Sequence, residues 1–371
     1  MKNKLIIMSR ITCMLVLAVS IMWACREEWP KTVVWTDTSA LPDTLYQNPV
    51  FEPDLADPTF VRAADGTFYA YGTENTWEAG KHHVTPIIMS KDLINWSYVA
   101  DAFTTKPNWG SANAGVWAPQ IFLRDDGKYL LYYSLSTWGD SNPGIGVAIS
   151  EKPEGPFTDE GKVFRSSESG VGNGIDPFFI SAGSGARKKN YMFWGSFQGI
   201  YYVEMTDYKT PNWNTKKQIA NNMFEAVYIY LYEGKYYFFG SLGSCCEGAD
   251  SQYRVSVARA DAITGPYLTQ DGTNILTNGV GGTQFLAGNR DYGWVGPGHN
   301  GEIISDDNGR YFILYHAVEV TNPFLPGGAT RRPLMLDEIT WVDGWPIINY
   351  GTENQGRPSK GLKESPFFEK K

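Results

Sequence analysis

Cysteine is scarce in this sequence, which has four cysteines among 371 residues. Cys13 lies in an N-terminal apolar segment and Cys245 and Cys246 are adjacent, so a framework of several disulfides is excluded. The adjacent pair can form a strained vicinal bridge or stay as two free thiols, and we interpret both as packing residues. Neither a CxxC pair nor a histidine-rich spacing indicates structural zinc.

Positive charge is also in short supply. The chain has 32 Lys and Arg against 40 Asp and Glu, which gives a formal charge of −8. Nucleic-acid binding needs a basic stripe, so we expect no nucleic-acid partner and favour an uncharged substrate. Long helical periodicity is absent, while 42% of the residues are hydrophobic and 15% aromatic. This composition predicts one soluble unit with a large core, which we expect to be a monomer.

A long apolar run occurs only near the N-terminus. Three basic residues precede an apolar run at 11–24, which is too short and too near the start to span a membrane, so 1–24 is predicted to be a signal peptide. Cys25 follows an alanine, as in a bacterial lipobox, and we expect it to be lipidated. The acidic pair behind it resembles the surface-export signal of Bacteroidetes lipoproteins. Residues 25–48 are then expected to be a tether.

These features together predict an exported lipoprotein of the outer membrane, at the cell surface or on its periplasmic face. Contact with the membrane is expected only through the lipid anchor. The remainder, 49–371, is predicted to be a single catalytic domain.

One pattern occurs five times in that domain: a polar or acidic entry, an apolar strand, a turn, and an aromatic strand ending in small residues. The five copies begin at Asp57, Ala118, Asp176, Glu225 and His299. Hairpins are expected within the copies, for example where Phe60–Arg62 meets Phe68–Ala70 across an Asp-Gly turn. Short-strand repeats of about 50 to 70 residues predict an all-β, five-bladed β-propeller whose entry strands line one axis.

Three of the five entries carry carboxylates, namely Asp57, Asp176 and Glu225. In a propeller they would each begin an innermost strand and meet at the mouth of the axial tunnel. Clustered carboxylates raise one another's pKa values, so one can stay protonated as an acid while another is ionised as a base. A single Asp-Pro is typical of a turn, but three carboxylates in register with the repeat predict the chemistry of glycosidic cleavage.

The entry motifs resemble those of glycoside hydrolase family 43 over nearly the whole mature chain. The matching segments are Leu55–Thr59, Trp117–Gln120, Gly174–Pro177, Phe224–Ile229 and Gly296–Asn300. Within that family the α-1,5-arabinanases are most similar, because of Ser244–Gly248 and the run that leads through Ser251–Tyr253 to Ile263–Tyr267. The resemblance implies an arabinan or arabino-oligosaccharide substrate that is cleaved with inversion, and we favour internal (endo) cleavage.

The resemblance also implies a role for each site residue. Asp57 corresponds to the general base that activates water, Glu225 to the general acid, and Asp176 to the carboxylate that tunes and orients the acid. His299 corresponds to a residue that arabinanases place near a calcium ion, with water supplying most of the coordination.

Candidate substrate contacts are Trp117, as an aromatic lining the cleft, and Asn173 and Ser196, as hydrogen-bonding partners of sugar hydroxyls. Each has a structural alternative: a core position for the tryptophan, and a capping or turn role for the other two. Ala56 and Gln198 depart from residues common in relatives, so the subsites stay open.

Other functions remain open at this point. The same propeller could carry an exo-arabinanase, an α-arabinofuranosidase or a β-xylosidase, which an analysis of the products would distinguish. A non-catalytic glycan-binding lipoprotein is a further alternative, although it has no need of three carboxylates in register. Invertase-like propellers are disfavoured because their acid motif continues Glu-Cys, where this chain has Glu225-Ala226.

Overall fold

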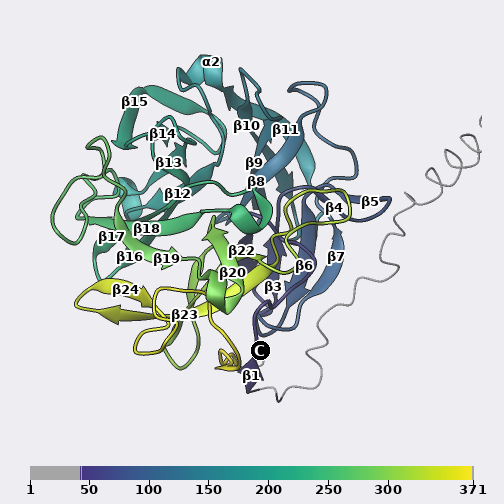
Figure 1. Ribbon diagram of the computed structural model, residues 1–371. Coiled ribbons are helices and arrows are strands. Elements are labelled where there is room, and N and C mark those ends of the chain that lie inside the picture. Colours follow the sequence, from purple (N-terminus) through teal and green to yellow (C-terminus); the bar gives the residue numbers. More distant parts are fainter. Residues whose placement is uncertain (1–41, 43, 370–371) are drawn as a thin grey trace, which may run out of the picture. The chain divides into compact units, whose positions relative to one another are not determined.

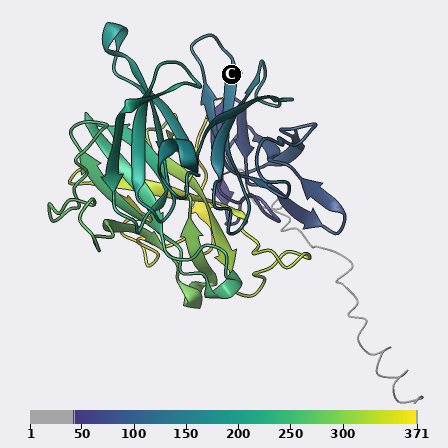
Figure 2. The ribbon, with the colours of Figure 1, turned by 90° about the horizontal axis from the view of Figure 1, so that it is seen from above.

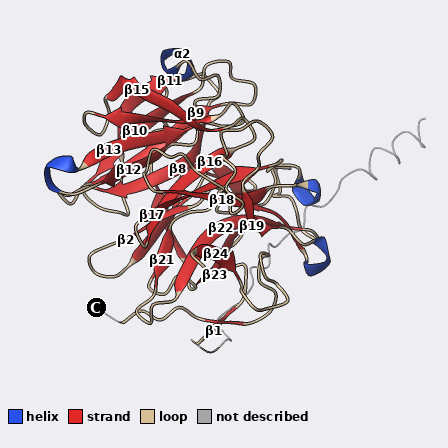
Figure 3. Cartoon of the chain, turned by 90° about the vertical axis from the view of Figure 1, so that its left-hand side faces the viewer, coloured by secondary structure: helices blue, strands red, loops and turns tan. Residues whose placement is uncertain are grey.

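The computed structural model describes residues 42 and 44–369. Their regular structure is almost entirely β-strand, with single-turn helices between strands (Figure 3). The predicted signal peptide, Cys25 and most of the predicted tether lie outside the described residues. Within the described part of the chain, no helix is long and apolar enough to cross a membrane.

Five antiparallel sheets, named blades 1 to 5, follow one another along the chain, and Figure 1 shows their labels in chain order around a common centre. Blade 1 consists of β2 (Thr59–Arg62), β3 (Phe68–Tyr71), β6 (Pro86–Ser90) and β7 (Ser97–Asp101), with a side hairpin of β4 (Asn75–Glu78) and β5 (Lys81–His83). Blade 2 consists of β8 (Gly115–Leu123), β9 (Tyr129–Ser136), β10 (Gly144–Ser150) and β11 (Thr158–Arg165), followed by the short helix α2 (Ser166–Ser169).

Blades 3 to 5 repeat this order. Blade 3 consists of β12 (Phe178–Ala182), β13 (Lys189–Trp194), β14 (Ile200–Met205) and β15 (Pro211–Ala220), with η2 (Gly185–Arg187). Blade 4 consists of β16 (Glu225–Tyr232), β17 (Lys235–Leu242), β18 (Arg254–Ala260) and β19 (Thr283–Ala287), with η3 (Gly248–Asp250). In blade 5, β20 (Trp294–Gly298) and β21 (Ile303–Ser305) both pair with β22 (Tyr311–Glu319), followed by β23 (Leu334–Val342) and β24 (Trp345–Ile348), and η4 (Arg290–Tyr292) precedes β20. The predicted five-bladed propeller is confirmed.

The inner hairpins form where the sequence places them. In blade 1, Phe60 pairs with Ala70 and Arg62 with Phe68. The turns of blades 1, 2 and 5 each use an Asp-Gly or Asn-Gly pair whose glycine, Gly66, Gly127 or Gly309, has a φ above +80°. Only glycine adopts this conformation without a steric cost, so these dipeptides determine where each hairpin reverses.

The ends of the described chain meet beside blade 1. Strand β1 (Leu45–Tyr46) pairs with β25 (Lys363–Glu364), and Figures 1 and 2 both place the C-terminus next to the first strands. Tyr46 is buried, and Asn48 exchanges two hydrogen bonds of 2.8 Å with the backbone of Leu336 in β23. The boundary predicted at residue 48 is therefore a few residues too late, because β1 and Asn48 already pack against the last blade.

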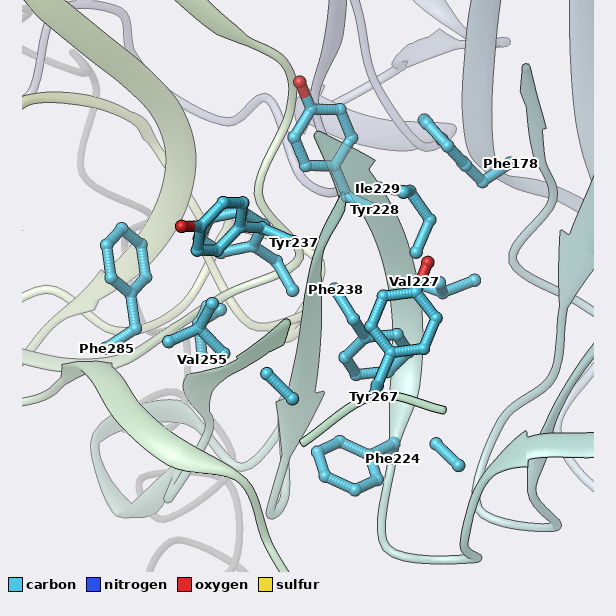
Figure 4. Packing of buried hydrophobic residues seen from close by; sticks show 14 of the residues in the cluster. Phe178, Phe224, Val227, Tyr228, Ile229, Tyr237, Phe238, Val255, Tyr267 and Phe285 are labelled. Atoms are coloured by element: carbon cyan, nitrogen blue, oxygen red, sulfur yellow. The ribbon is translucent and has the colours of Figure 1, made fainter. Parts of the chain in front are cut away.

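Most of the core lies between neighbouring blades. In Figure 4, Phe178 of blade 3 lies beside Tyr228 of blade 4, with ring centroids 5.2 Å apart in an edge-to-face arrangement. The same cluster includes Phe285 of blade 4, whose ring centroid lies 5.0 Å from that of Phe239, and it continues on the other face of β17, where Phe238 packs against Tyr267 at 5.6 Å. Each blade thus buries both faces, and their packing holds the inner strands in a ring.

Candidate active site

A cleft of about 880 Å³ contains every site residue predicted within the described chain. Its lining includes Asp57, Trp117, Asn173, Asp176, Ser196, Glu225 and His299. Glu225 begins β16 as expected, whereas Asp57 and Asp176 lie two residues before β2 and β12. The cleft thus gathers side chains from all five blades, as expected for a site at the axis of a propeller.

An unusual backbone conformation recurs at the inner strand of every blade. Near the start of each inner strand, or just after it in blade 5, one non-glycine residue has positive φ: Asp57 (54°), Ala118 (43°), Asp176 (58°), Ala226 (55°) and His299 (41°). Such a conformation costs roughly 1–2 kcal/mol per residue. In blades 2 and 4 it occurs where the register between the first two strands shifts, a feature that re-aims neighbouring side chains.

Hydrogen bonds between blades hold these five positions. Each positive-φ residue donates its backbone N–H to a side chain of the preceding blade: Asp57 to His316 Nδ1 (3.0 Å), Ala118 to Thr73 Oγ1 (2.8 Å), Asp176 to Ser134 Oγ (2.9 Å), Ala226 to Asp176 Oδ2 (3.2 Å) and His299 to Ser241 Oγ (2.9 Å). Each net hydrogen bond contributes about 1 kcal/mol, which offsets much of the backbone cost. Three of the acceptors, Thr73, Ser134 and Ser241, are small residues in or just after the second strand of their blade, and they help to position the next blade.

Asp57 is held as an ionised carboxylate. Its Oδ2 accepts from Thr73 Oγ1 at 2.6 Å, and its Oδ1 accepts from Arg332 Nη1 at 2.9 Å. His299 Nδ1 lies 3.3 Å from the same Oδ1. Burial acts to raise the pKa of Asp57, but the Arg332 guanidinium and the neighbouring His299 outweigh it and hold the pKa well below its usual range. An ionised carboxylate is the form that a general base requires.

Glu225 is held by two hydroxyl groups. Tyr253 donates to Oε1 at 2.5 Å, and Ser196 donates to Oε2 at 2.7 Å. Burial raises the pKa of Glu225, while these two hydrogen bonds act in the opposite direction. The Ser196 hydroxyl, predicted as a sugar contact, is therefore bonded to the candidate acid.

Asp176 lies between the other two carboxyl groups in chain order and accepts the N–H of Ala226, the residue that follows Glu225. Burial raises its pKa to about 7, and the charges of Glu225 and Asp57 add to the rise while His299 opposes it. Asp176 and Glu225 therefore retain protons near neutral pH more readily than ordinary carboxyls, while Asp57 does not. The assignment of Asp57 as base and Glu225 as acid stays a prediction, which this contrast in pKa supports.

Two histidines flank Asp57. His316 is fully buried, and because its Nδ1 accepts the Asp57 N–H, the ring is the neutral tautomer with its proton on Nε2. Burial, together with the charge of Arg332, keeps the pKa of His316 well below its usual value. Burial lowers the pKa of His299, but Asp57, Asp176 and Glu225 outweigh it and raise the pKa overall.

The fit of a calcium-type ion depends on His299. In its neutral form with the proton on Nδ1, facing Asp57, His299 has a lone pair on Nε2, and Asp57, Asp176 and Glu225 in the same cleft supply negative charge. Among the described residues, however, no three His, Cys, Asp or Glu side chains form a set that could hold a metal. These donors fit a cation that keeps most of its water, and they do not form a cage of protein oxygens.

The other predicted substrate contacts differ in their surroundings. Trp117 lies 5.7 Å from Trp138, ring centroid to centroid, and Trp138 is 78% exposed at the cleft. Trp117 is thus a cleft residue with an exposed aromatic neighbour. Asn173 Nδ2 donates to the carbonyl of Ser196 at 3.2 Å, which supports the turn that carries Ser196.

Cys245 and Cys246 form the vicinal disulfide. Both line the cleft and are partly exposed, so the interpretation as packing residues is wrong. Arg332, Thr73 and His316 were not identified from the sequence. The adjacent pair Arg331-Arg332, in a chain with few basic residues, was a signal for Arg332, whereas no local motif marks Thr73 or His316 as a partner of Asp57.

Comparison with known proteins agrees with this geometry. The family model described as Glycosyl hydrolases family 43 matches residues 46–346. The extracellular endo-α-(1→5)-L-arabinanase 1 of Bacillus subtilis (strain 168) is 33% identical over 304 residues, covering 79% of this chain and 87% of the relative. The extracellular exo-α-(1→5)-L-arabinofuranosidase ArbA of Cellvibrio japonicus is 29% identical over 353 residues, covering 87% of this chain and 94% of the relative.

A solved structure is similar as well. The α-L-arabinanase of Cellvibrio cellulosa complexed with arabinohexaose superposes with a TM-score of 0.68 at 29% identity, and the match covers 81% of this chain and 96% of that one. The residues that the family model matches include Asp57, Asp176 and Glu225. This chain belongs to glycosyl hydrolase family 43.

Proposed function

We propose that the protein hydrolyses α-1,5-L-arabinofuranosidic bonds of arabinan with inversion, cutting within the chain. The observation that carries the proposal is the electrostatic contrast in one cleft between Asp57, which is held ionised, and Asp176 and Glu225, whose pKa values are raised. A relative named as an endo-arabinanase and a similar structure that binds arabinohexaose support the substrate class.

The mechanism follows from the roles of the three carboxyl groups. Asp57 takes a proton from a water molecule, and the oxygen of that water attacks the anomeric carbon as the glycosidic bond breaks. Glu225 gives its proton to the departing oxygen, so a neutral hydroxyl leaves. Inverting enzymes place base and acid roughly 6.5 to 9.5 Å apart so that the water fits between them. Arg332 and Thr73 orient the base, and Tyr253 and Ser196 orient the acid.

Product analysis tests the proposal. Linear arabinan should yield a ladder of oligosaccharides at early times, and proton NMR during hydrolysis should detect the inverted anomer first. Arabinose or a single short oligosaccharide as the sole early product would instead indicate terminal (exo) cleavage, as the name of the Cellvibrio japonicus exo-α-(1→5)-L-arabinofuranosidase describes for that relative. Absence of any product from linear or branched arabinan, with binding retained, would make the protein a glycan-binding module.

A calcium ion held through His299 and water is part of this proposal. Bound there, it would supply positive charge beside the three carboxyl groups and displace the proton from the imidazole. We expect chelation to reduce kcat several-fold and added Ca²⁺ to restore it, with terbium luminescence reporting the same site. His299→Ala should abolish both effects without unfolding the protein. Unchanged activity after chelation, with no metal detected by mass spectrometry, would leave His299 as a hydrogen-bonded structural residue.

We further propose that the mature chain is a monomeric outer-membrane lipoprotein attached through Cys25. The support is the sequence alone, namely the apolar run at 11–24 and the alanine before the cysteine. Wild-type protein should partition with membranes and Cys25→Ser should not. Identical partitioning of both would remove the anchor.

A further inference from the structure

The Cys245–Cys246 disulfide is not used by the mechanism above. The two residues lie between β17 and β18 of blade 4, and their sulfurs are bonded to each other. Both side chains are partly exposed on the wall of the cleft that contains the carboxyl groups. A disulfide that only stabilised the fold would gain little from this position, because a bridge between adjacent residues closes almost no loop.

The loop that carries the disulfide is held firmly. Ser251 Oγ donates to the Cys245 carbonyl at 3.2 Å and accepts the N–H of Glu247 at 3.0 Å. The N–H of Gly248 donates to Thr330 Oγ1 of blade 5, also at 3.0 Å. Phe324 packs over Gly248 so closely that an added Cβ would lie 2.3 Å from its ring. The sulfurs are thus presented in a fixed position, and a ligand that binds them loses little entropy to loop ordering.

The chemistry of the disulfide contrasts with its neighbours. Ser244 and Glu247 on the same loop and Arg332 in the same cleft offer donors and acceptors, whereas two bonded sulfurs have no donor and accept only weakly. They form a small, polarisable, apolar patch. A sugar ring has the matching property, since one face shows C–H groups while its hydroxyls project from the edge.

The patch also has a defined place relative to the reaction. The same loop leads into Tyr253, whose hydroxyl holds Glu225 at 2.5 Å. The aromatic pair Trp117 and Trp138 comes from blade 2, so it forms a separate apolar wall. The disulfide therefore lies on the side of the candidate acid, where the departing part of the substrate is expected.

We propose that the Cys245–Cys246 disulfide is a rigid apolar platform for the C–H face of a sugar ring in the half of the cleft next to Glu225. This inference rests on the proposed function for the identity of the sugar chain. It assigns the disulfide to substrate recognition, and it leaves the acid and base roles of the carboxyl groups unchanged.

Calorimetry with arabinohexaose tests the platform in a catalytically silent Glu225→Gln background. Adding Cys245→Ser and Cys246→Ser should weaken the Kd about 5- to 10-fold, the size expected for one polarisable ring contact. Leu231→Ala is the matched control, since Leu231 is an exposed apolar residue near the far end of β16 and should leave the Kd unchanged. Equal Kd values with and without the disulfide overturn the platform. Absence of arabinohexaose binding in the reference protein overturns the proposed function itself.

Kinetics of the Cys245→Ser, Cys246→Ser variant, with Glu225 present, show whether the disulfide contacts the substrate or only supports the loop that leads to Tyr253. If the disulfide is a platform, KM should rise in this variant, while kcat and the alkaline limb of its pH profile should stay unchanged. A loop that merely supports Tyr253 predicts a shifted alkaline limb instead, because Glu225 would lose a hydrogen bond, and that result overturns the inference. Reduction of the wild-type disulfide by a phosphine, which is oxidised as two thiols form, should raise KM in the same way without changing the sequence.

Discussion

Asp57→Ala is expected to lower kcat by about 10² to 10⁴ on arabinan and on nitrophenyl arabino-oligosaccharides alike. The reason is that water must be activated whatever group departs, and the pKa values of Asp176 and Glu225 are raised, whereas that of Asp57 is lowered. Azide should restore part of the activity on the nitrophenyl substrate, because it attacks the anomeric carbon without giving up a proton. The product should be the glycosyl azide of inverted configuration.

The controls for this variant test whether the protein still folds. Removing the Asp57 carboxylate leaves Arg332 buried without its partner, which destabilises the protein, so thermal unfolding must accompany the kinetics. Asp57→Asn, which can still accept from Thr73, provides a second variant with less disturbance. Asp65→Asn is the matched control, since Asp65 is an exposed residue in the β2–β3 turn of the same blade. Loss of activity on arabinan alone, with the nitrophenyl substrate spared, would exchange the assigned roles of Asp57 and Glu225.

Unlike Asp57→Ala, Glu225→Ala is expected to affect the two substrates differently. Hydrolysis of arabinan should fall by about 10² to 10⁴, because the departing sugar oxygen leaves poorly without a proton. Nitrophenolate leaves without one, so nitrophenyl arabino-oligosaccharides should keep activity within roughly tenfold of the wild type. The alkaline limb of the pH profile should also disappear with that substrate. In the wild type this limb reports the loss of the acid's proton, at a pH raised by the burial of Glu225.

Two further variants sharpen the result. Glu233→Gln changes an exposed glutamate in the β16–β17 turn of the same blade and should behave as the wild type. Tyr253→Phe keeps the acid but removes a hydrogen bond that favours its ionised form, so the alkaline limb should move to higher pH. If Glu225→Ala loses both substrates equally and azide rescues it, Glu225 is the base.

Short sequence patterns were sufficient to predict the strands and turns of the inner hairpins. The hairpin from Phe60 to Ala70 formed where an Asp-Gly pair separates two apolar runs, because the left-handed turn conformation is a property of glycine itself. The start of the domain was misjudged because the segment from Leu45 to Asn48 has no such local signal. Those residues become ordered only by pairing with β25 and β23, at the other end of the chain.

The partners of the candidate site depended on contacts between distant residues. Arg332 is 275 residues from Asp57 and His316 is 259 residues away, yet each makes a direct hydrogen bond to it. No local pattern encodes such a contact. It arises because closing the ring brings the last blade against the first, so that His316 of β22 and Arg332, just before β23, reach Asp57.

The amino-acid sequence was enough to predict the five-bladed architecture and the three carboxylates Asp57, Asp176 and Glu225, because the repeat places equivalent positions on one axis. The other four cleft residues were predicted from the family resemblance and from their positions beside the repeat entries. Tertiary structure decided which carboxyl group is ionised and which retain a proton. That difference comes from burial and from neighbours such as Arg332 and Tyr253, which act over a few ångströms between residues of different blades or strands. It also placed Cys245 and Cys246 on the wall of the cleft, because exposure of a loop depends on what the neighbouring blades leave uncovered.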